Sequence, residues 1–449
     1  MGRLRRNVCL ALATAAMTGL GVRVQAAEPS YDELKQEVDQ LKARLDQVES
    51  KQTEAVTARD VDATVERVIR DADQRSQLLQ MEGFTAGYTK GRFTIQDAAG
   101  NWVFRPTFQF QLRWASNFRD DGKHGGSDED DNHGFEIPRM KFGFDGNAFS
   151  PNLTYNFLWN TKSTDGSVGL EQAWVRYQTN DQWAIRAGQI INPVIREQAI
   201  GSRTQLAADR SLMNTLITGA GEARTQVVTA QYDNKTGPLW AEFGMEDGFN
   251  SQNTDFTDPN FTPTNNDWGI LGRVNWFVKG PRSEYNDFTA LGNKDDLLVI
   301  GAGGDVTQSG DTTAYLHTVD VQWENTGGLS VYGAYVGNYI DLGSGGGNDS
   351  LYNWGFLIQT GYLFNPNWEV FGRWDYTKLD GSAVSSGLAD EYCEITIGLN
   401  WYVFGGHNAK FTVDGTWLPN GSPTDVKAAD ILASQDNEFI FRGQFQLLL

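Results

Sequence analysis

The sequence contains little cysteine and proline, and each shortage excludes a class of protein. The only cysteines are Cys9 and Cys393, too few for a disulfide-stabilised fold. Proline occurs 12 times against 49 glycines, and aromatic residues make up 12% of the chain, which favours strands and turns over helices. A mean hydropathy of −0.45 excludes a bundle of transmembrane helices but fits a transmembrane barrel, in which half of every strand is polar.

Basic charge, histidine and catalytic motifs are scarce as well. The formal net charge of −20 argues against a nucleic acid as partner. The 4 histidines show no metal-ligand spacing, and the sequence has neither a Gly-x-Ser-x-Gly elbow nor a phosphate-binding glycine loop. The acidic connection 119–133 lacks the register of a calcium-binding loop, so we interpret it as a solvated loop. We therefore predict no cofactor, no metal site and no enzyme activity.

Two segments precede the strand-rich region. Residues 1–26 combine a basic start, a short apolar stretch and a small-residue end at Ala26, the pattern of a secretory signal peptide. Residues 27–82 form the second segment, in which apolar residues recur at a/d spacing: Leu34, Val38, Leu41, Leu45 and Val48, then Val61, Val65, Val68 and Ala72. This spacing predicts a self-associating coiled coil; an amphipathic helix without such a partner is the alternative.

From residue 83 to residue 449 the hydrophobic period changes to two. The end of the chain shows it clearly, because five apolar residues share one parity: Phe439, Phe441, Phe445, Leu447 and Leu449. Arg442, Gln444 and Gln446 occupy the other parity. An apolar strand at the chain terminus would be an aggregation-prone edge in a soluble protein, but it is expected in a barrel with lipid outside and water inside.

We count sixteen candidate strands: 104–118, 134–149, 153–162, 169–180, 183–190, 225–234, 239–249, 268–280, 296–308, 313–324, 329–340, 352–364, 368–379, 391–404, 409–419 and 438–449. A small hairpin at 93–102 precedes them. Short and long connections alternate, as in bacterial barrels, except that 281–295 is too long and 309–312 too short. A mispaired strand near 281–312 is therefore one hypothesis. The predicted fold is all-β: a 16-stranded antiparallel transmembrane β-barrel with an N-terminal helical or coiled-coil extension.

One region resembles a known family. It comprises Phe135 to Phe142, the run Gly169 to Val175, the run Ile185 to Gln189, and then Pro193, Arg196-Glu197, Ser202 and Asp209-Arg210-Ser211. This region is similar to the phosphate-selective porin O and P family. The resemblance implies a sixteen-stranded, trimeric outer-membrane channel, which in some members conducts phosphate past lumenal arginines and a lysine cluster. The lysines of this chain are scattered and form no such cluster.

Because successive side chains of a strand point to opposite faces, the alternation along each strand predicts which charged residues line the lumen. Ten basic residues are expected there: Arg105, Arg113, Arg139, Lys141, Arg176, Arg186, Arg273, Arg373, Lys410 and Arg442. Eight acidic residues share that side: Asp145, Glu242, Asp320, Glu324, Glu369, Asp375, Glu394 and Asp414. Mixed signs are typical of a water-filled pore but do not by themselves define a selective site.

The long connection 191–224 is the predicted pore constriction. Its apolar residues, such as Leu206, need burial, and the barrel interior is the nearest shelter. The predicted anion path consists of Arg196, Arg203, Arg210 and Arg224, because guanidinium groups offer forked donors to oxyanions. The alternative is that these arginines tie the connection to acidic wall residues such as Glu242.

The function predicted from the sequence is an outer-membrane porin for passive diffusion of small solutes, with a preference for anions or phosphate. The expected partners are outer-membrane lipid, small solutes or anions, and two further copies in a homotrimer, with residues 27–82 in the periplasm. Two alternatives remain at this stage. One is a structural barrel that tethers the envelope through a helical stalk; the other is a barrel hydrolase using His317, which lies inside a predicted strand.

Overall fold

The computed structural model describes residues 31–54, 65–70, 83–89, 92–119, 131–161, 163, 165–253, 267–343, 350–382, 389–434 and 436–449. The predicted signal peptide and most of the acidic connection 119–133 lie outside the described residues. The chain divides into two units, Met1–Leu79 and Gln80–Leu449.

The first unit contains helix. Helix α1 spans Tyr31–Glu54, and residues 65–70 are also helical. The a/d residues Val38, Leu41 and Leu45 are each about half exposed in the single chain, at 48%, 60% and 61%. Among the described helices, none has the length and apolar character needed to cross a membrane.

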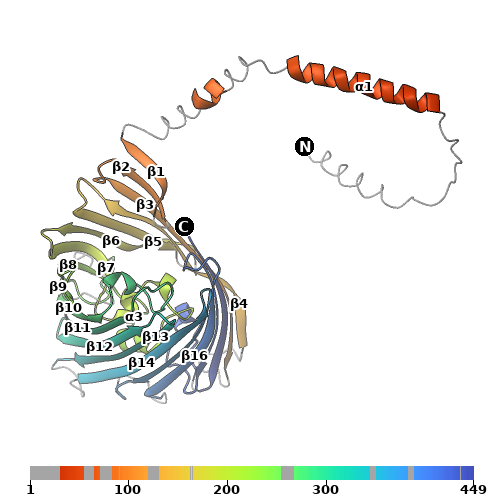
Figure 1. The fold of residues 1–449 in the computed structure, drawn as a ribbon. Coiled ribbons are helices and arrows are strands. Elements are labelled where there is room, and N and C mark those ends of the chain that lie inside the picture. The colour runs from red at the N-terminus through yellow and green to blue at the C-terminus, as the bar shows by residue number, and fades with distance from the viewer. Residues whose placement is uncertain are drawn as a thin grey trace. The chain divides into compact units, whose positions relative to one another are not determined.

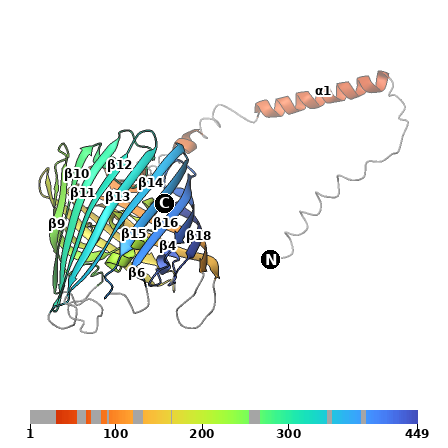
Figure 2. The same ribbon diagram turned by 90° about the horizontal axis from the view of Figure 1, so that it is seen from below.

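The second unit is a β-barrel (Figures 1 and 2). Its strands are β1 (Phe84–Thr89), β2 (Arg92–Asp97), β3 (Val103–Arg119), β4 (Asp131–Asn147), β5 (Leu153–Thr161), β6 (Val168–Gln178), β7 (Trp183–Ile191), β8 (Arg224–Asp233), β9 (Leu239–Glu246), β10 (Trp268–Lys279), β11 (Leu297–Ser309), β12 (Thr312–Glu324), β13 (Leu329–Asp341), β14 (Ser350–Asn365), β15 (Trp368–Lys378), β16 (Glu391–Tyr402), β17 (Ala409–Leu418) and β18 (Glu438–Leu448).

Sixteen of these strands, β3 to β18, each pair antiparallel with the next, and β18 pairs with β3 to close the barrel. The closing register runs from Glu438 opposite Arg119 to Leu448 opposite Gln109. Leu449 and Phe108 then exchange two backbone hydrogen bonds of 3.0 Å. The predicted sixteen-stranded barrel is confirmed, and every strand boundary lies within three residues of its predicted position.

The strands in the irregular region near 281–312, β11 and β12, pair in the expected register. Strands β11 and β12 pair from Leu297 opposite Glu324 to Ser309 opposite Thr312 in unbroken register. The hypothesis of a mispaired strand is therefore wrong. The connection 280–296 is long because it folds into the barrel, where Tyr285 and Phe288 are buried.

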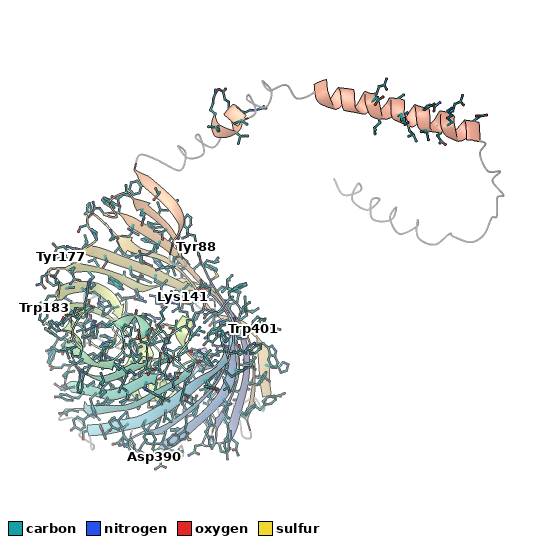
Figure 3. All side chains as sticks on the ribbon, in the orientation of Figure 1. Tyr88, Lys141, Tyr177, Trp183, Asp390 and Trp401 are labelled. Carbon is teal, nitrogen blue, oxygen red and sulfur yellow. The ribbon has the colours of Figure 1, made fainter. Side chains whose placement is uncertain are left out.

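Side chains alternate between the two faces of the wall as the period of two predicts. On β18, Phe439 and Phe441 are exposed on the outside, whereas Glu438 and Arg442 are buried on the inside. We call the barrel end with the short connections, such as 366–367, the turn end, and the opposite end the loop end. Aromatic residues gather outside near the turn end, where the Trp368 and Trp401 rings stack with centroids 5.6 Å apart. Figure 3 labels three aromatic residues near this end: Tyr177, Trp183 and Trp401.

A hairpin precedes the barrel. Strands β1 and β2 pair with each other, and β2 joins the barrel only where Ile95 and Gln96 lie opposite Phe104 and Val103 of β3. The predicted turn near 98–101 is present, but the sequence analysis did not predict β1.

The connection between β7 and β8, residues 192–223, lies inside the barrel, and we call it the inner loop (Figure 1). It contains α3 (Arg196–Ala199), the 3-10 turn η1 (Ser202–Thr204) and α4 (Leu212–Thr218). The Ser211 hydroxyl caps α4 by accepting a hydrogen bond from the Asn214 amide at 3.2 Å. At the other end Gly219 adopts a left-handed φ of 71°, which glycine tolerates without strain.

The inner loop packs against one side of the barrel wall. Its buried apolar residues include Val194, Ile195, Ile200, Leu206, Met213 and Ile217. They meet inward-facing apolar residues of the wall: Leu271, Leu316, Tyr332, Val336, Leu357 and Phe371. At Gly355 on β14, a Cβ atom would lie 2.7 Å from Met213 Cγ and 2.5 Å from the Tyr376 carbonyl oxygen, so a glycine permits this close docking. The loop therefore fills the half of the lumen bounded by β10–β17.

Candidate functional site

The water-accessible part of the lumen lies along β3–β7. Some inward-facing residues there, such as Thr107, Asn156 and Gln172, keep part of their surface exposed. Others on the same strands, such as Gln111 and Lys141, are buried. On the opposite wall the inward-facing Glu369 and Asp375 have no exposed surface. The inner loop covers that wall, so the open space in the lumen lies between the loop and β3–β7, and we call it the water route.

Two cavities lie along this route. The turn-end cavity has a volume of about 190 Å³ and is lined by residues that include Arg92, Asp145 and Arg203. The loop-end cavity has a volume of about 430 Å³ and is lined by residues that include Arg139 and Arg210. Lys141, which Figure 3 labels, and Glu222 line both cavities. Lys141 and Glu222 therefore lie between the two cavities.

We call Lys141, Glu171, Glu222 and Arg224 the constriction. The Lys141 ammonium donates to Glu171 and lies 3.8 Å from Glu222. The Arg224 guanidinium lies 2.8 Å from Glu222 and 3.4 Å from Glu171. Arg210 approaches Glu222 at 3.5 Å from the inner loop. Opposite charges thus face each other at the constriction, two basic and two acidic, and Arg210 adds a third basic group beside them.

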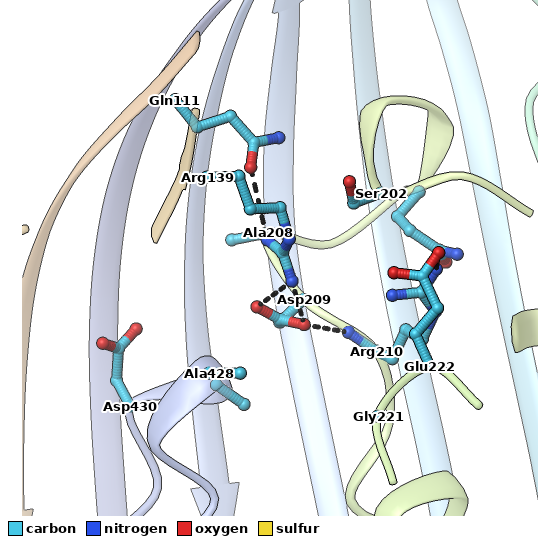
Figure 4. Close-up of polar contacts among 12 residues, drawn as sticks. Gln111, Arg139, Ser202, Ala208, Asp209, Arg210, Gly221, Glu222, Ala428 and Asp430 are labelled. Atoms are coloured by element: carbon cyan, nitrogen blue, oxygen red, sulfur yellow. Dashed lines mark hydrogen bonds and ion pairs between the residues drawn. The ribbon is translucent and has the colours of Figure 1, made fainter. Parts of the chain in front are cut away.

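Asp209 of the inner loop joins the loop to the wall (Figure 4). Arg139 donates to both of its carboxylate oxygens at 2.9 Å, and Arg113 lies 3.1 Å away. Burial alone would raise the pKa of Asp209, but the charges of Arg139, Arg113 and Arg210 outweigh burial and hold it below its usual range. The contacts of Asp209 therefore favour its ionised form.

The predicted lumenal basic residues divide into two groups by their partners. In the first group an acidic wall residue is the main partner: Arg105 pairs with Asp145 at 2.7 Å and Arg186 with Glu242 at 2.6 Å. Arg176 instead donates to Gln231 and Gln178. Arg139 and Lys141, described above, lie beside the water route.

The second group holds folded-in segments through their backbone carbonyls. Arg113 donates to the carbonyl oxygens of Ala208 at 3.1 Å and Ala428 at 2.9 Å. The other donors reach one carbonyl oxygen each: Arg273 that of Val194 (2.8 Å), Arg373 that of Asp209 (2.8 Å), Lys410 that of Gln205 (2.8 Å) and Arg442 that of Ala429 (2.9 Å). Arg273, Arg373 and Arg442 also pair with Asp320, Glu394 and Asp414. All of these side chains are buried and line neither cavity except through their partners. The four arginines are compensated by carboxylates, Arg113 by Asp209 and Asp430, whereas no ion pair of Lys410 is found among the described residues.

The four arginines of the predicted anion path are not all together. Arg203 lines the turn-end cavity, and Arg210 and Arg224 line the loop-end cavity. Arg196 lies elsewhere: its guanidinium carbon is 3.5 Å from the centre of the Tyr285 ring, and Nε donates to Gln322 at 3.1 Å. The alternative interpretation holds for Arg224, which pairs with Glu171 of the wall at 3.4 Å, but its example is wrong, because Glu242 pairs with Arg186 of the wall.

Two sets of residues that face the lumen were not predicted from the sequence. One set is the inward-facing apolar residues of the wall under the inner loop. They occupy positions that are otherwise polar in the alternation of their strands, and this exception is visible in the sequence. The other is Arg92 of β2, which enters the turn-end cavity from outside the barrel wall. No local signal places a hairpin residue in the pore. His317, the residue of the hydrolase alternative, lies exposed outside the barrel with its ring stacked on Tyr352.

Comparison with known proteins agrees with this architecture. A sequence model of the phosphate-selective porin O and P family matches residues 89–338. No curated protein matches the sequence significantly.

Solved structures with the same fold include an anion-selective porin from Comamonas acidovorans, with 12% identity, a TM-score of 0.52 and coverage of 77% of this chain and 99% of the porin. Salmonella typhi OmpF in complex with daunomycin has 13% identity and a TM-score of 0.54 over 78% of this chain and 98% of OmpF. Pseudomonas putida OprB at high pH has 8% identity and a TM-score of 0.51 over 77% of this chain and 94% of OprB. At these identities the likeness is one of fold. The family match spans more than half of the sequence, and the chain therefore belongs to the phosphate-selective porin O and P family.

Proposed function

We propose that this outer-membrane porin conducts small hydrophilic solutes with a modest preference for anions, set where the route narrows at Lys141. The observation that carries the proposal is the charge along the two cavities. They are lined by seven basic residues (Arg92, Arg139, Lys141, Arg203, Arg210, Arg224 and Lys427) and five acidic residues (Glu136, Asp145, Glu171, Asp209 and Glu222).

The excess of basic groups matters because the route is narrow. Low-dielectric walls focus the field of nearby charges, whereas charges farther away than a Debye length of about 8 Å at physiological salt are screened. The net charge of −20 therefore does not set the selectivity, since acidic groups outside the route act through screened solvent. The opposing pairs at the constriction limit the preference, so both ion signs pass.

The proposed assembly is a homotrimer with the turn end in the periplasm and residues 31–80 extending from it. Support comes from the exposed a/d residues Val38, Leu41 and Leu45 of α1, which need a partner in water. Chemical cross-linking of purified full-length protein, followed by mass measurement, tests the stoichiometry. Finding monomer alone would refute the trimer without affecting the channel proposal.

Planar-bilayer recording tests the channel. The reversal potential of the wild-type channel in a KCl gradient should show higher permeability for chloride than for potassium. Lys141→Gln should shift it towards potassium, because Glu171 and Glu222 then keep only Arg224 and Arg210 as nearby cations. Lys235→Gln is the matched control, since Lys235 is an exposed turn-end residue that lines neither cavity. A wild-type channel that prefers potassium would refute the proposal.

A further inference from the structure

The hairpin that precedes the barrel places a charge in the pore. Strand β2 attaches to β3 through only two residue pairs, yet its Arg92 side chain reaches the inner face of the wall. There the guanidinium donates to Thr107 Oγ1 at 2.6 Å and to the Asp145 carboxylate. The Arg92 side chain keeps 39% of its surface exposed, so its charge remains in contact with water.

Two guanidinium groups share the single carboxylate of Asp145, and a third lies in the same cavity without an ion pair. Arg92 and Arg105 both form ion pairs with it, and Arg203 lies in the same cavity as Arg92 and Asp145. No carboxylate of the described residues lies within ion-pair distance of Arg203. Desolvation in the cavity and repulsion from Arg92 lower the pKa of Arg203, although Asp145 opposes them, which is consistent with two like charges at close range.

The Arg203 position is fixed by neighbours on two strands. Gln446 of β18 donates to its carbonyl oxygen at 3.0 Å, and Gln109 of β3 donates to the Ser202 hydroxyl at 3.1 Å. The backbone that carries Arg203 is thus held in place by the barrel wall. Elsewhere along the route, at the constriction and at Asp209, basic groups face acidic groups almost one to one.

We propose that Arg92, Arg105 and Arg203 form a charged turn-end mouth that makes the conductance of this channel asymmetric, with Arg92 supplied by a segment outside the barrel wall. The inference rests on the proposed channel function. Anions that enter from the turn end are concentrated by the mouth before they reach the constriction, whereas anions from the loop end meet a nearly balanced path. Current therefore differs between the two polarities in symmetric salt.

The expected size follows from Coulomb's law. One unit charge about 7 Å from the path changes the local ion concentration about 1.5-fold in water at a Debye length of about 10 Å. Removal of Arg92 should reduce the ratio of currents at opposite voltages by about that factor. At about 1 M salt, where the Debye length is about 3 Å, the asymmetry should disappear.

Single-channel current–voltage curves of the full-length protein test the proposal. They are recorded in about 0.1 M KCl, where the Debye length is about 10 Å, and in about 1 M KCl, where it is about 3 Å. The magnitude of the current ratio does not depend on the direction of insertion. Arg92→Gln and Arg203→Gln should each lower the ratio at low salt, whereas Arg92→Lys, which retains the charge, and the control Lys235→Gln should keep the wild-type ratio. A heat-induced shift in gel electrophoresis confirms that each variant is folded.

Two outcomes would overturn the inference. An Arg92→Gln channel that keeps the wild-type ratio shows that the hairpin does not contribute to the mouth. Loss of the ratio in Arg92→Lys as well shows that the shape of the hairpin, and not its charge, is responsible. Either result leaves the reversal potential of the wild-type channel intact, whereas a wild-type channel without anion preference refutes the proposed function instead.

Discussion

Replacing Asp209 by asparagine should increase the anion preference of the channel. Asp209 lies beside the water route, accepts hydrogen bonds from Arg139 at 2.9 Å on both oxygens and lies 3.1 Å from Arg113. The asparagine side chain would keep the shape of the aspartate and one acceptor oxygen but would remove the negative charge. Arg139, which lines the loop-end cavity, would then face the route without its main counter-charge.

The magnitude follows from the position of the charge. A unit charge about 6 Å from a permeating ion in water contributes about 0.7 kcal/mol, which screening at a Debye length of about 10 Å reduces to about 0.4 kcal/mol. That energy changes the local concentration of each ion about twofold, in opposite directions for the two signs. The ratio of chloride to potassium permeability should therefore rise about fourfold.

The Asp209→Asn variant should still fold as a barrel. Breaking a buried ion pair costs about 3–5 kcal/mol, but Arg113 keeps Asp430 at 2.8 Å and Glu136 at 3.4 Å. The inner loop also keeps its anchors at Ala208 and Leu212, whose amides donate to Asp414 and Glu394 at 2.8 and 2.7 Å. A folded variant with an unchanged reversal potential, or one shifted towards potassium, would refute the assignment of the route.

The difference between wild type and Asp209→Asn should persist at acid pH. The pKa of Asp209 is lowered in the folded protein, so its stabilising contribution is complete above the unfolded pKa of about 3.9 and is lost only as pH falls through the lower folded value. Other carboxyl groups titrate in both proteins, and comparison of the two reversal potentials removes their effect. If the two proteins converge between about pH 7 and pH 4, Asp209 does not carry the charge that its contacts imply.

Three further predictions concern the inner loop and the extension. Arg196→Gln should leave the reversal potential unchanged, because Arg196 is buried against Tyr285, whereas Arg203→Gln should shift it towards potassium; equal shifts in the two variants would contradict the geometry. Met213→Ala should destabilise the packing of the inner loop by about 2–5 kcal/mol and increase the noise of the single-channel current. A heat-induced gel shift would show that the barrel is still folded. Current noise equal to that of the wild type would mean that the loop does not depend on this contact. Deletion of residues 31–80 should leave a heat-modifiable barrel but weaken the oligomer in cross-linking, and failure of the barrel to fold would contradict the separation into two units.

The sequence predicts the barrel wall well because the signals for strands are local. Alternation along β18 assigns Phe439 to the outside and Arg442 to the inside without knowledge of any other strand, and short polar connections such as Asn365-Pro366-Asn367 mark the turns. The long connection 280–296 misled the prediction of pairing, because its length reflects a segment folded into the lumen rather than a strand out of register.

The site was less predictable because charge compensation depends on partners far apart in sequence. Arg196 and Arg203 are seven positions apart in one loop, yet one is buried against Tyr285 and the other opens into a cavity. Parity correctly places Arg373 inside the barrel, but it cannot indicate that the guanidinium donates to the carbonyl of Asp209, 164 positions away. Counting lumenal charges therefore overstates the number that a solute meets.

The electrostatics of this pore depend on which charged wall residues the inner loop leaves next to the route. The total number of basic residues in the wall matters less. A guanidinium buried by the loop has to be paired, because an uncompensated buried charge costs several kcal/mol. Arg273, Arg373 and Arg442 meet this requirement with a carboxylate and a backbone carbonyl each, and so contribute no field to the route. Lys141 of β4 is also buried and paired with Glu171, but it lines both cavities along β3–β7, so its charge lies at the surface of the route. Variants that reshape the inner loop should consequently change selectivity even where they alter no charged residue.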